Sequence, residues 1–316
     1  MSRVKFVCLL AVAVFLVQTS SVFAIAGIGL QYGLDMTMKM NNTYMEQTTF
    51  NNLKFSLNGL ASLPDTFTSS SFLTGKDIPI FINRTDWKNT GINLGGKIYI
   101  DVVPVVDAIE ISGNFGVWQY NGSVLYPSSI TPNGQAPGPN SSFKDLVNIN
   151  YDTLPISLKQ LYPNRFFWGV TETPYAKLHL DATVRKYLLQ VPPVINMFKI
   201  YGGAGLSVDF ATPMLSSQLI QDAIGSALNG TYSIDQFPQI FNNPNIERKI
   251  IDQILNNLMT PHFGCNIALG AMFKIPLVPI GIYIDGKYII LFSKLDKYVD
   301  VGGTGLLLNF GAALAF

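Results

Sequence analysis

Few side chains in this sequence are spaced for catalysis. The two histidines, His179 and His262, lie near the ends of segments that alternate like β-strands, and Asp181 and Asp209 lie in similar segments. Histidine beside a carboxylate can transfer protons or bind a metal. However, no Cys/His cluster has metal-ligand spacing, and no Gly-x-Ser-x-Gly nucleophile motif occurs. We therefore interpret the histidines as structural residues and expect no enzyme, no cofactor and no metal site.

Two further binding chemistries are disfavoured. The run Gly202-Gly203-Ala204-Gly205 resembles a phosphate-binding loop, but Lys and Ser/Thr do not follow at the required spacing. A formal net charge of +1 provides no electrostatic basis for binding nucleic acid. We therefore expect no nucleic-acid partner.

The segments that carry these residues alternate with a period of two. From Ala26 to Met40 every even position is apolar, and the odd positions are glycine or polar. Successive side chains of a strand point to opposite faces, and about nine to eleven residues suffice to cross a membrane. The polar face includes Asp35 and Lys39, which indicates a wet interior. The same pattern recurs in eight later segments: 50–60, 91–103, 108–120, 175–189, 196–210, 262–275, 280–292 and 300–316.

The last of these segments indicates the class of protein to which the sequence is similar. Even positions from Leu306 to Phe316 are large and apolar or alanine, and odd positions are mostly small or polar. A terminal strand of this kind resembles the bacterial outer-membrane β-barrel proteins. The resemblance implies a bacterial outer-membrane location, contact with membrane lipid, and a C-terminal signal for the barrel-assembly machinery. That signal would comprise Phe310, Leu314 and Phe316.

Bulk composition and the N-terminus agree with this class. Arg3 and Lys5, an apolar run over 6–17 and the small residues before Ala24 predict a signal peptide over 1–24, cleaved after Ala24. Residues 25–316 then form one barrel domain. Apolar residues are 48% and charged residues 13% of the chain, without a later apolar run long enough for a transmembrane helix. Five Asn-x-Ser/Thr sequons could instead indicate a glycosylated secreted protein, but we attribute them to the Asn-, Ser- and Thr-rich composition.

The connections alternate in length, as in outer-membrane barrels. Pro-containing turns near 104–106, 191–194 and 276–279 are short, whereas 121–165 is a long external loop and 211–260 a long polar stretch. The strands named above number nine, but a barrel with both ends in the periplasm needs an even number. A strand within 66–83 supplies the tenth. We therefore predict an antiparallel up-and-down transmembrane β-barrel of about ten strands, within a range of eight to twelve.

A helical insertion is expected at about 212–259. Thr212-Pro213 can start one helix, and Asn243-Pro244 can start a second that carries Ile246, Ile250 and Ile254 on one face. Both are too short to cross a bilayer. The hairpin either packs on the outer rim or enters the lumen as a lid or plug, and we favour the rim.

The interior positions mix both charge signs with amides. In a small barrel they either pair and seal the interior or line an open pore, and we favour sealing. The candidates that we expect to face the lumen are Asp35, Lys39, Lys54, Lys97, Asp101, Glu110, Lys199, Asp209, Asn266 and Asn309.

Three functions follow as hypotheses. The first is a porin-like or hydrophobic-solute transport barrel with a helical lid. The second is a non-transporting envelope barrel that acts as an anchor, adhesin or structural protein through its external loops. The third is a soluble secreted β-sandwich, which would need no detergent for extraction.

Overall fold

The structure is a computed structural model that describes residues 26–40, 44–56, 73–101, 106–135, 143–164, 169–192, 197–227, 232–233, 241, 244–256, 260–275, 278–296 and 299–315. Eight antiparallel strands form a closed barrel, because β3 pairs with both β1 and β4 and thereby joins the two ends of the strand order. In order around the ring they are β3 (Leu73–Asp101), β4 (Ala108–Pro132), β6 (Thr173–Val191), β7 (Phe198–Ala211), β9 (Pro261–Lys274), β10 (Ile280–Leu291), β11 (Gly305–Ala315) and β1 (Ala26–Asp35).

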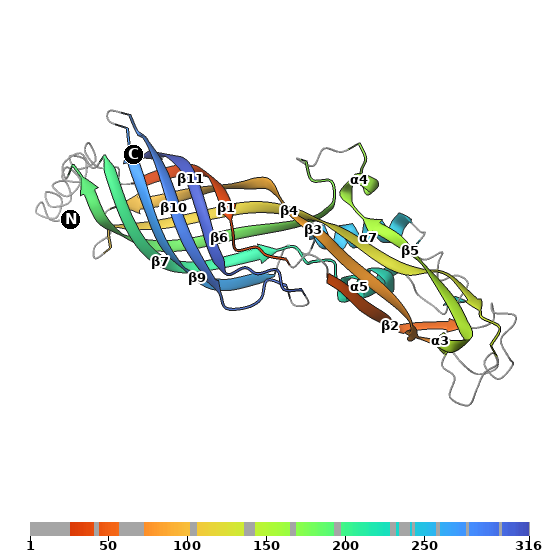
Figure 1. Ribbon diagram of the computed structural model, residues 1–316. Helices are drawn as coiled ribbons and strands as arrows, with labels where there is room; N and C mark the ends of the chain where they lie inside the picture. The colour runs from red at the N-terminus through yellow and green to blue at the C-terminus, as the bar shows by residue number, and fades with distance from the viewer. Residues whose placement is uncertain are drawn as a thin grey trace, which may run out of the picture.

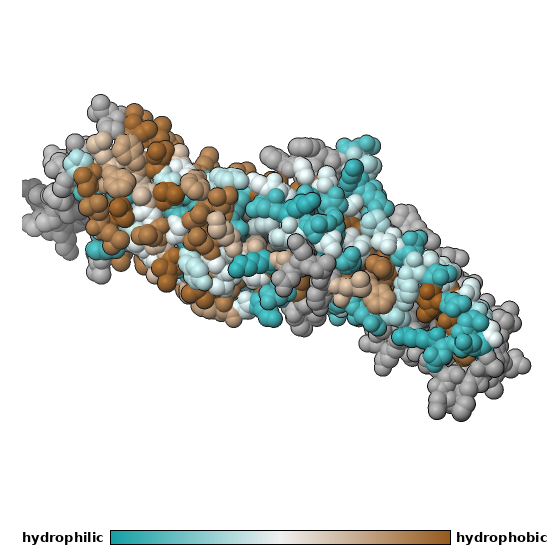
Figure 2. Space-filling view, in the orientation of Figure 1, coloured by the Kyte–Doolittle hydropathy of each residue, from teal (hydrophilic) through white to brown (hydrophobic). Residues whose placement is uncertain are grey.

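The outer face of the barrel is apolar on every strand. Leu30 is 78% exposed, Leu206 70% and Ile267 59%, and similar residues alternate along the other strands. Figure 2 shows apolar side chains over the barrel and polar ones over much of the opposite end of the molecule. A barrel with an apolar exterior and no free sheet edge satisfies its backbone hydrogen bonds in lipid.

Two barrel strands continue far beyond the ring. β3 has 29 residues and β4 has 25, and their outer parts pair with β2 (Tyr44–Ser56) and β5 (Val147–Ile156), respectively. Figure 1 shows these strands projecting from the barrel end opposite the C-terminus. The predicted total of about ten strands is therefore confirmed as eight in the ring and two beside it. A two-residue strand, β8 (Tyr232–Ser233), pairs with β2.

The predicted division of this region into strands was wrong in detail. The tenth strand within 66–83 and the strand over 91–103 are one continuous element, β3, over the described part. The register between β3 and β4 shifts at Thr85/Lys88 and at Asn89/Ile92, and Asp86 and Gly91 have positive φ. These bulges break the period-two pattern and so hide the continuity of the strand. Likewise, β5 lies inside the segment expected to be a long external loop.

The helical insertion is present beside the projecting strands, at the barrel end opposite the C-terminus (Figure 1). It consists of α5 (Ser217–Ala227) and α7 (Pro244–Asn256), and two short helices, α3 (Phe143–Leu146) and α4 (Leu158–Leu161), flank β5. α5 begins later than predicted, because residues 212–216 are not helical. Among the described helices, none is both long and apolar enough to cross a membrane.

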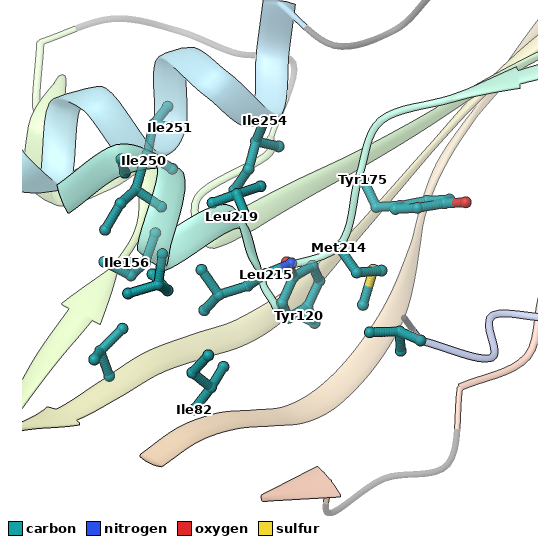
Figure 3. Packing of buried hydrophobic residues seen from close by; sticks show 14 of the residues in the cluster. Ile82, Tyr120, Ile156, Tyr175, Met214, Leu215, Leu219, Ile250, Ile251 and Ile254 are labelled. Carbon is teal, nitrogen blue, oxygen red and sulfur yellow. The ribbon is translucent and has the colours of Figure 1, made fainter. Parts of the chain in front are cut away.

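The helices and the projecting strands share a hydrophobic core. Ile82 of β3, Ile156 of β5, Leu219 of α5 and Ile250 and Ile254 of α7 are buried in one cluster (Figure 3). The predicted apolar stripe of the second helix therefore faces this core. We call the unit formed by residues 73–90, 121–132, β2, β5, α3, α4, α5 and α7 the cap.

Candidate functional site

Most of the predicted interior residues lie inside the barrel. Asp101, Glu110, Asp209, Asn266 and Asn309 are at most 6% exposed. The side chains of Asp35, Lys97 and Lys199 are at most 8% exposed and form ion pairs there. Polar and apolar side chains alternate along each strand. Closure of the sheet therefore turns the polar side chains inward and the apolar ones outward.

Two predicted interior residues do not lie there. Lys39 follows the end of β1 and is exposed, because the strand stops at Asp35 although the alternation in the sequence continues. Lys54 belongs to β2, which pairs outside the ring, and its side chain lies outside the described residues. Ala24 and Phe316 also lie outside the described residues, whereas Phe310 and Leu314 are 41% and 44% exposed on the apolar face.

The strongest interior contacts form a central cluster of charges. Lys287 Nζ donates to Glu110 Oε1 at 2.9 Å and to Asp181 Oδ1 at 2.8 Å. Lys97 Nζ lies 2.8 Å from Asp285 Oδ2. Arg185 pairs with Glu110 and also lies 3.6 Å from Asp285. The six side chains therefore form one network contributed by β3, β4, β6 and β10.

A second cluster lies toward the cap. Lys177 Nζ lies 3.0 Å from Asp35 Oδ2 and 3.6 Å from Asp209 Oδ2. His179 stands between two carboxylates, with Nδ1 2.5 Å from Asp209 and Nε2 3.2 Å from Asp181. The histidine thus joins this cluster to the central one. Its carboxylate neighbours are in turn held by lysines, Asp209 by Lys177 and Asp181 by Lys287.

Amides and tyrosines fill the remaining interior. Asn114 contacts Gln31 at 2.6 Å and donates to Asn93 and Asn309 at 3.1 and 3.0 Å. Three buried tyrosines each stand opposite a glycine of the neighbouring strand, in the register pairs Gly27–Tyr99, Gly270–Tyr201 and Gly311–Tyr283. A Cβ on any of these glycines would lie within 2.6 Å of the tyrosine ring. The missing side chains therefore make room for rings inside the barrel.

The described interior leaves little unpaired charge. Five cationic side chains, Lys97, Lys177, Arg185, Lys199 and Lys287, meet six carboxylates, with His179 between two of the latter. Sequence reasoning missed Lys177, Arg185, Asp285 and Lys287 as interior residues. They follow the same alternation as the predicted ones, so the pattern was sufficient to find them.

Aromatic side chains pack together at the end of the barrel that carries the cap. Trp87 stacks against Trp118 and Tyr120 at ring-centroid distances of 6.2 Å and lies 5.4 Å from Tyr175. Figure 3 shows Met214 beside Tyr120 and Tyr175, where the chain leaves β7 for α5. Residues 212–216, which we call the closing segment, therefore lie over this aromatic layer.

Buried polar contacts fix the closing segment. The Leu215 N–H donates to Tyr120 Oη at 2.9 Å, and the Met214 N–H donates to Asp296 Oδ2 at 2.8 Å. Arg84 is fully buried, donates to the Leu215 carbonyl and pairs with Glu46 at 3.3 Å. These contacts tie the segment to β2, to the outer parts of β3 and β4, and to the connection after β10.

The second histidine lies in a surface pocket lined by both polar and apolar side chains. His262 Nδ1 is 3.2 Å from Ser293 Oγ, at the outer end of β9. The pocket has a volume of about 380 Å³ and includes Asp222, Gln253 and Asp296. Within the described part of the chain, no group of three or more His, Cys, Asp or Glu side chains is arranged to hold a metal ion.

A closed antiparallel ring with an apolar exterior and a polar interior defines the general class of outer-membrane β-barrels. No protein-family model matches the chain, and no curated protein sequence is similar to it. Among solved structures, the chain is similar to the β domain of the Bordetella autotransporter BrkA, with 8% identity over 93% of this chain and 100% of that one, at a TM-score of 0.22.

Proposed function

We propose that this protein is a non-transporting barrel of the bacterial outer membrane that anchors its cap at the cell surface for binding. The observation that carries the proposal is the filled interior. Lys287 and Arg185 reach carboxylates on other strands, and the aromatic layer and closing segment cover the mouth. Eight strands enclose a space just wide enough for side chains, which suits an anchor better than a pore.

The two ends of the barrel differ in the length of their connections, and this difference supports an orientation with the cap outside the cell. The connections near residues 102–107, 192–197 and 275–279 are short and lie at the same end as the pair Gly27–Ala315. Every connection at the other end is longer, and that end carries the cap. Outer-membrane barrels place short turns in the periplasm and long loops outside. We therefore assign the cap to the cell exterior.

Conductance in planar bilayers tests the sealed interior. The wild-type protein and a variant that lacks residues 213–259 should both remain silent, because the ionic network fills the barrel interior with side chains of the barrel strands and is retained in the variant. A transport barrel with a helical lid predicts stepwise conductance after the deletion, and such steps would overturn the proposal. Heat-modifiable gel mobility of both proteins must first show that each has inserted.

Surface labelling tests the orientation. In a Cys265→Ala background, Asn148→Cys places a thiol on the exposed side of β5, and Lys186→Cys places one at the other end of the barrel. A membrane-impermeant maleimide should label the first variant in intact cells and the second only after lysis. The reverse pattern would contradict the assignment of the cap to the exterior.

A further inference from the structure

An apolar groove lies on the outside of the barrel wall, beneath the cap. Its volume is about 360 Å³, and all nine of its lining residues are apolar. The floor comes from barrel strands and the roof from α4, α7 and the segment before β6. The floor residues are Ile92, Leu94, Phe115, Val117, Pro174 and Ala176, and the roof residues are Leu158, Val170 and Leu255.

The floor is a continuous strip across three strands. Val117 of β4 pairs with Ile92 of β3 on one side and with Ala176 of β6 on the other. Two residues nearer the periplasmic end, Phe115 pairs with Leu94. Side chains two apart share a face of the sheet, so this strip points outward. It belongs to the exposed apolar outer face of the barrel, which we call the apolar belt.

The roof separates the part of this strip around Val117 from solvent. Val117 is only 9% exposed although it faces outward, whereas Phe115 and Leu94 are 40% and 55% exposed. The difference arises because Val117 shares one buried cluster with Leu158 and Val170 of the roof, to which Phe115 and Leu94 do not belong. The groove therefore opens toward the periplasmic end of the barrel, where it is continuous with the apolar belt.

We propose that this groove binds one acyl chain of a membrane lipid, which enters sideways from the belt. Lipid chains already cover Leu94 and Phe115 where the belt meets hydrocarbon, so a chain that extends two residues farther reaches Val117 without crossing water. The groove provides contact area and requires no hydrogen-bond partner from its occupant. An acyl chain matches both properties, and its headgroup remains at the membrane surface beside the cap.

The floor offers a matched pair of substitutions. Ala176 is half-buried on the β6 side of the floor, next to Val117, so Ala176→Phe fills the groove. Ala182 lies on the same strand and the same outward face but outside the groove, where Ala182→Phe adds the same ring to the open belt. Leu255→Asp provides an independent change in the roof. Because Leu255 is 44% exposed, we expect the fold to tolerate the charge.

The experiment uses full-length protein in phosphatidylethanolamine nanodiscs that contain a lipid with a diazirine near the end of one acyl chain. After irradiation, mass spectrometry compares adducts on peptides with Ile92 or Val117 against belt peptides with Ile267 or Ile284. We expect enrichment on the groove peptides and its reduction by at least about fivefold in Ala176→Phe and Leu255→Asp, because both occupy or charge the apolar site. Ala182→Phe should retain the enrichment.

Two results would overturn the proposal. The first is labelling of groove peptides no stronger than that of the belt, and the second is unchanged enrichment in Ala176→Phe. Heat-modifiable mobility confirms that each variant is inserted, so a loss of labelling reports the groove and not the barrel. The proposal concerns the outer wall and is independent of whether the interior conducts.

Discussion

Lys287 on β10 and Asp181 on β6 meet across the inside of the barrel, with Nζ 2.8 Å from Oδ1 and 2.9 Å from Oδ2. Two strands, β7 and β9, separate β6 from β10 around the ring. The contact therefore spans the interior and does not follow the wall. The same ammonium group also donates to Glu110 and Ser112, both on β4.

Substitution of Lys287 should destabilise the barrel strongly. Lys287→Met removes the charge that Asp181 and Glu110 share, and all three side chains are fully buried. Removing one member of a buried ion-pair network costs about 3–5 kcal/mol of unfolding free energy, because its buried carboxylates then lack one positive charge. The shift of the urea midpoint for protein refolded in detergent micelles measures this loss.

A surface pair provides the control for that measurement. Lys186 lies 3.1 Å from Asp107, but its side chain is 63% exposed. Lys186→Met should change the unfolding free energy by no more than about 1 kcal/mol, because water screens the pair. If both variants lost the same stability, the interior network would not stabilise the barrel as we infer.

Because Tyr201 packs against Gly270, we predict that a methyl group added at Gly270 lowers the stability of the barrel. The Cβ of Gly270→Ala would lie 2.6 Å from the Tyr201 ring and closer still to Asp285 Oδ1, so the ring and the carboxylate that it contacts must both move. Overpacking of this kind costs about 1–3 kcal/mol. The urea midpoint should fall accordingly.

The matched control is Gly202→Ala. Its Cβ would come no closer than 3.5 Å to the Leu188 side chain, which is ordinary contact. Equal stability of the two alanine variants would show that Gly270 is not needed to accommodate Tyr201.

The sequence predicted the barrel because membrane strands need only a local pattern. The alternation from Ala26 to Asp35 is sufficient to assign two faces to β1 without knowledge of its neighbours. The partner of Lys287 is a different problem, because it depends on strand number and stagger in the closed ring, and one strand does not encode these. The continuity of β3 escaped prediction for a local reason, since bulges near Asp86 and Gly91 interrupt the pattern.

Loss of the Tyr120 hydroxyl should loosen the closing segment and leave the barrel intact. Tyr120→Phe deprives the buried Leu215 N–H of its acceptor, 2.9 Å away. An unpaired buried donor costs about 1–3 kcal/mol. Hydrogen–deuterium exchange of the peptide that contains Leu215 should quicken, whereas the peptides of β9 and β10 should keep their protection.

Tyr288→Phe is the control for the closing segment. Tyr288 is 49% exposed on the outer face of β10, so the loss of its hydroxyl leaves the mouth of the barrel unchanged. Exchange at Leu215 that remained slow in Tyr120→Phe would contradict the role assigned to this hydrogen bond.

The cap should become less stable as the pH rises above the acid range, because of Glu247. This residue lies in the first turn of α7 and is 5% exposed, and among the described residues its Oε1 has no hydrogen-bond partner. Burial raises the pKa of the Glu247 carboxyl above its ordinary value of 4.5, although a hydrogen bond from the Ser157 N–H lowers it in part. The folded cap therefore favours the protonated acid. This contribution to stability is complete below the unfolded pKa and is lost as the pH rises through the folded one.

Glu247→Gln isolates this effect, because it retains the shape of the side chain and removes its charge. At pH 7 the cap of the variant should be more stable than the wild-type cap by about 1 kcal/mol. At pH 4 this difference should vanish. Hydrogen–deuterium exchange of α7 at both pH values measures the difference. Asp252→Asn removes a carboxylate from a half-exposed position of the same helix and should leave the pH dependence in place. A wild-type pH profile that Glu247→Gln does not alter would assign the dependence to another group.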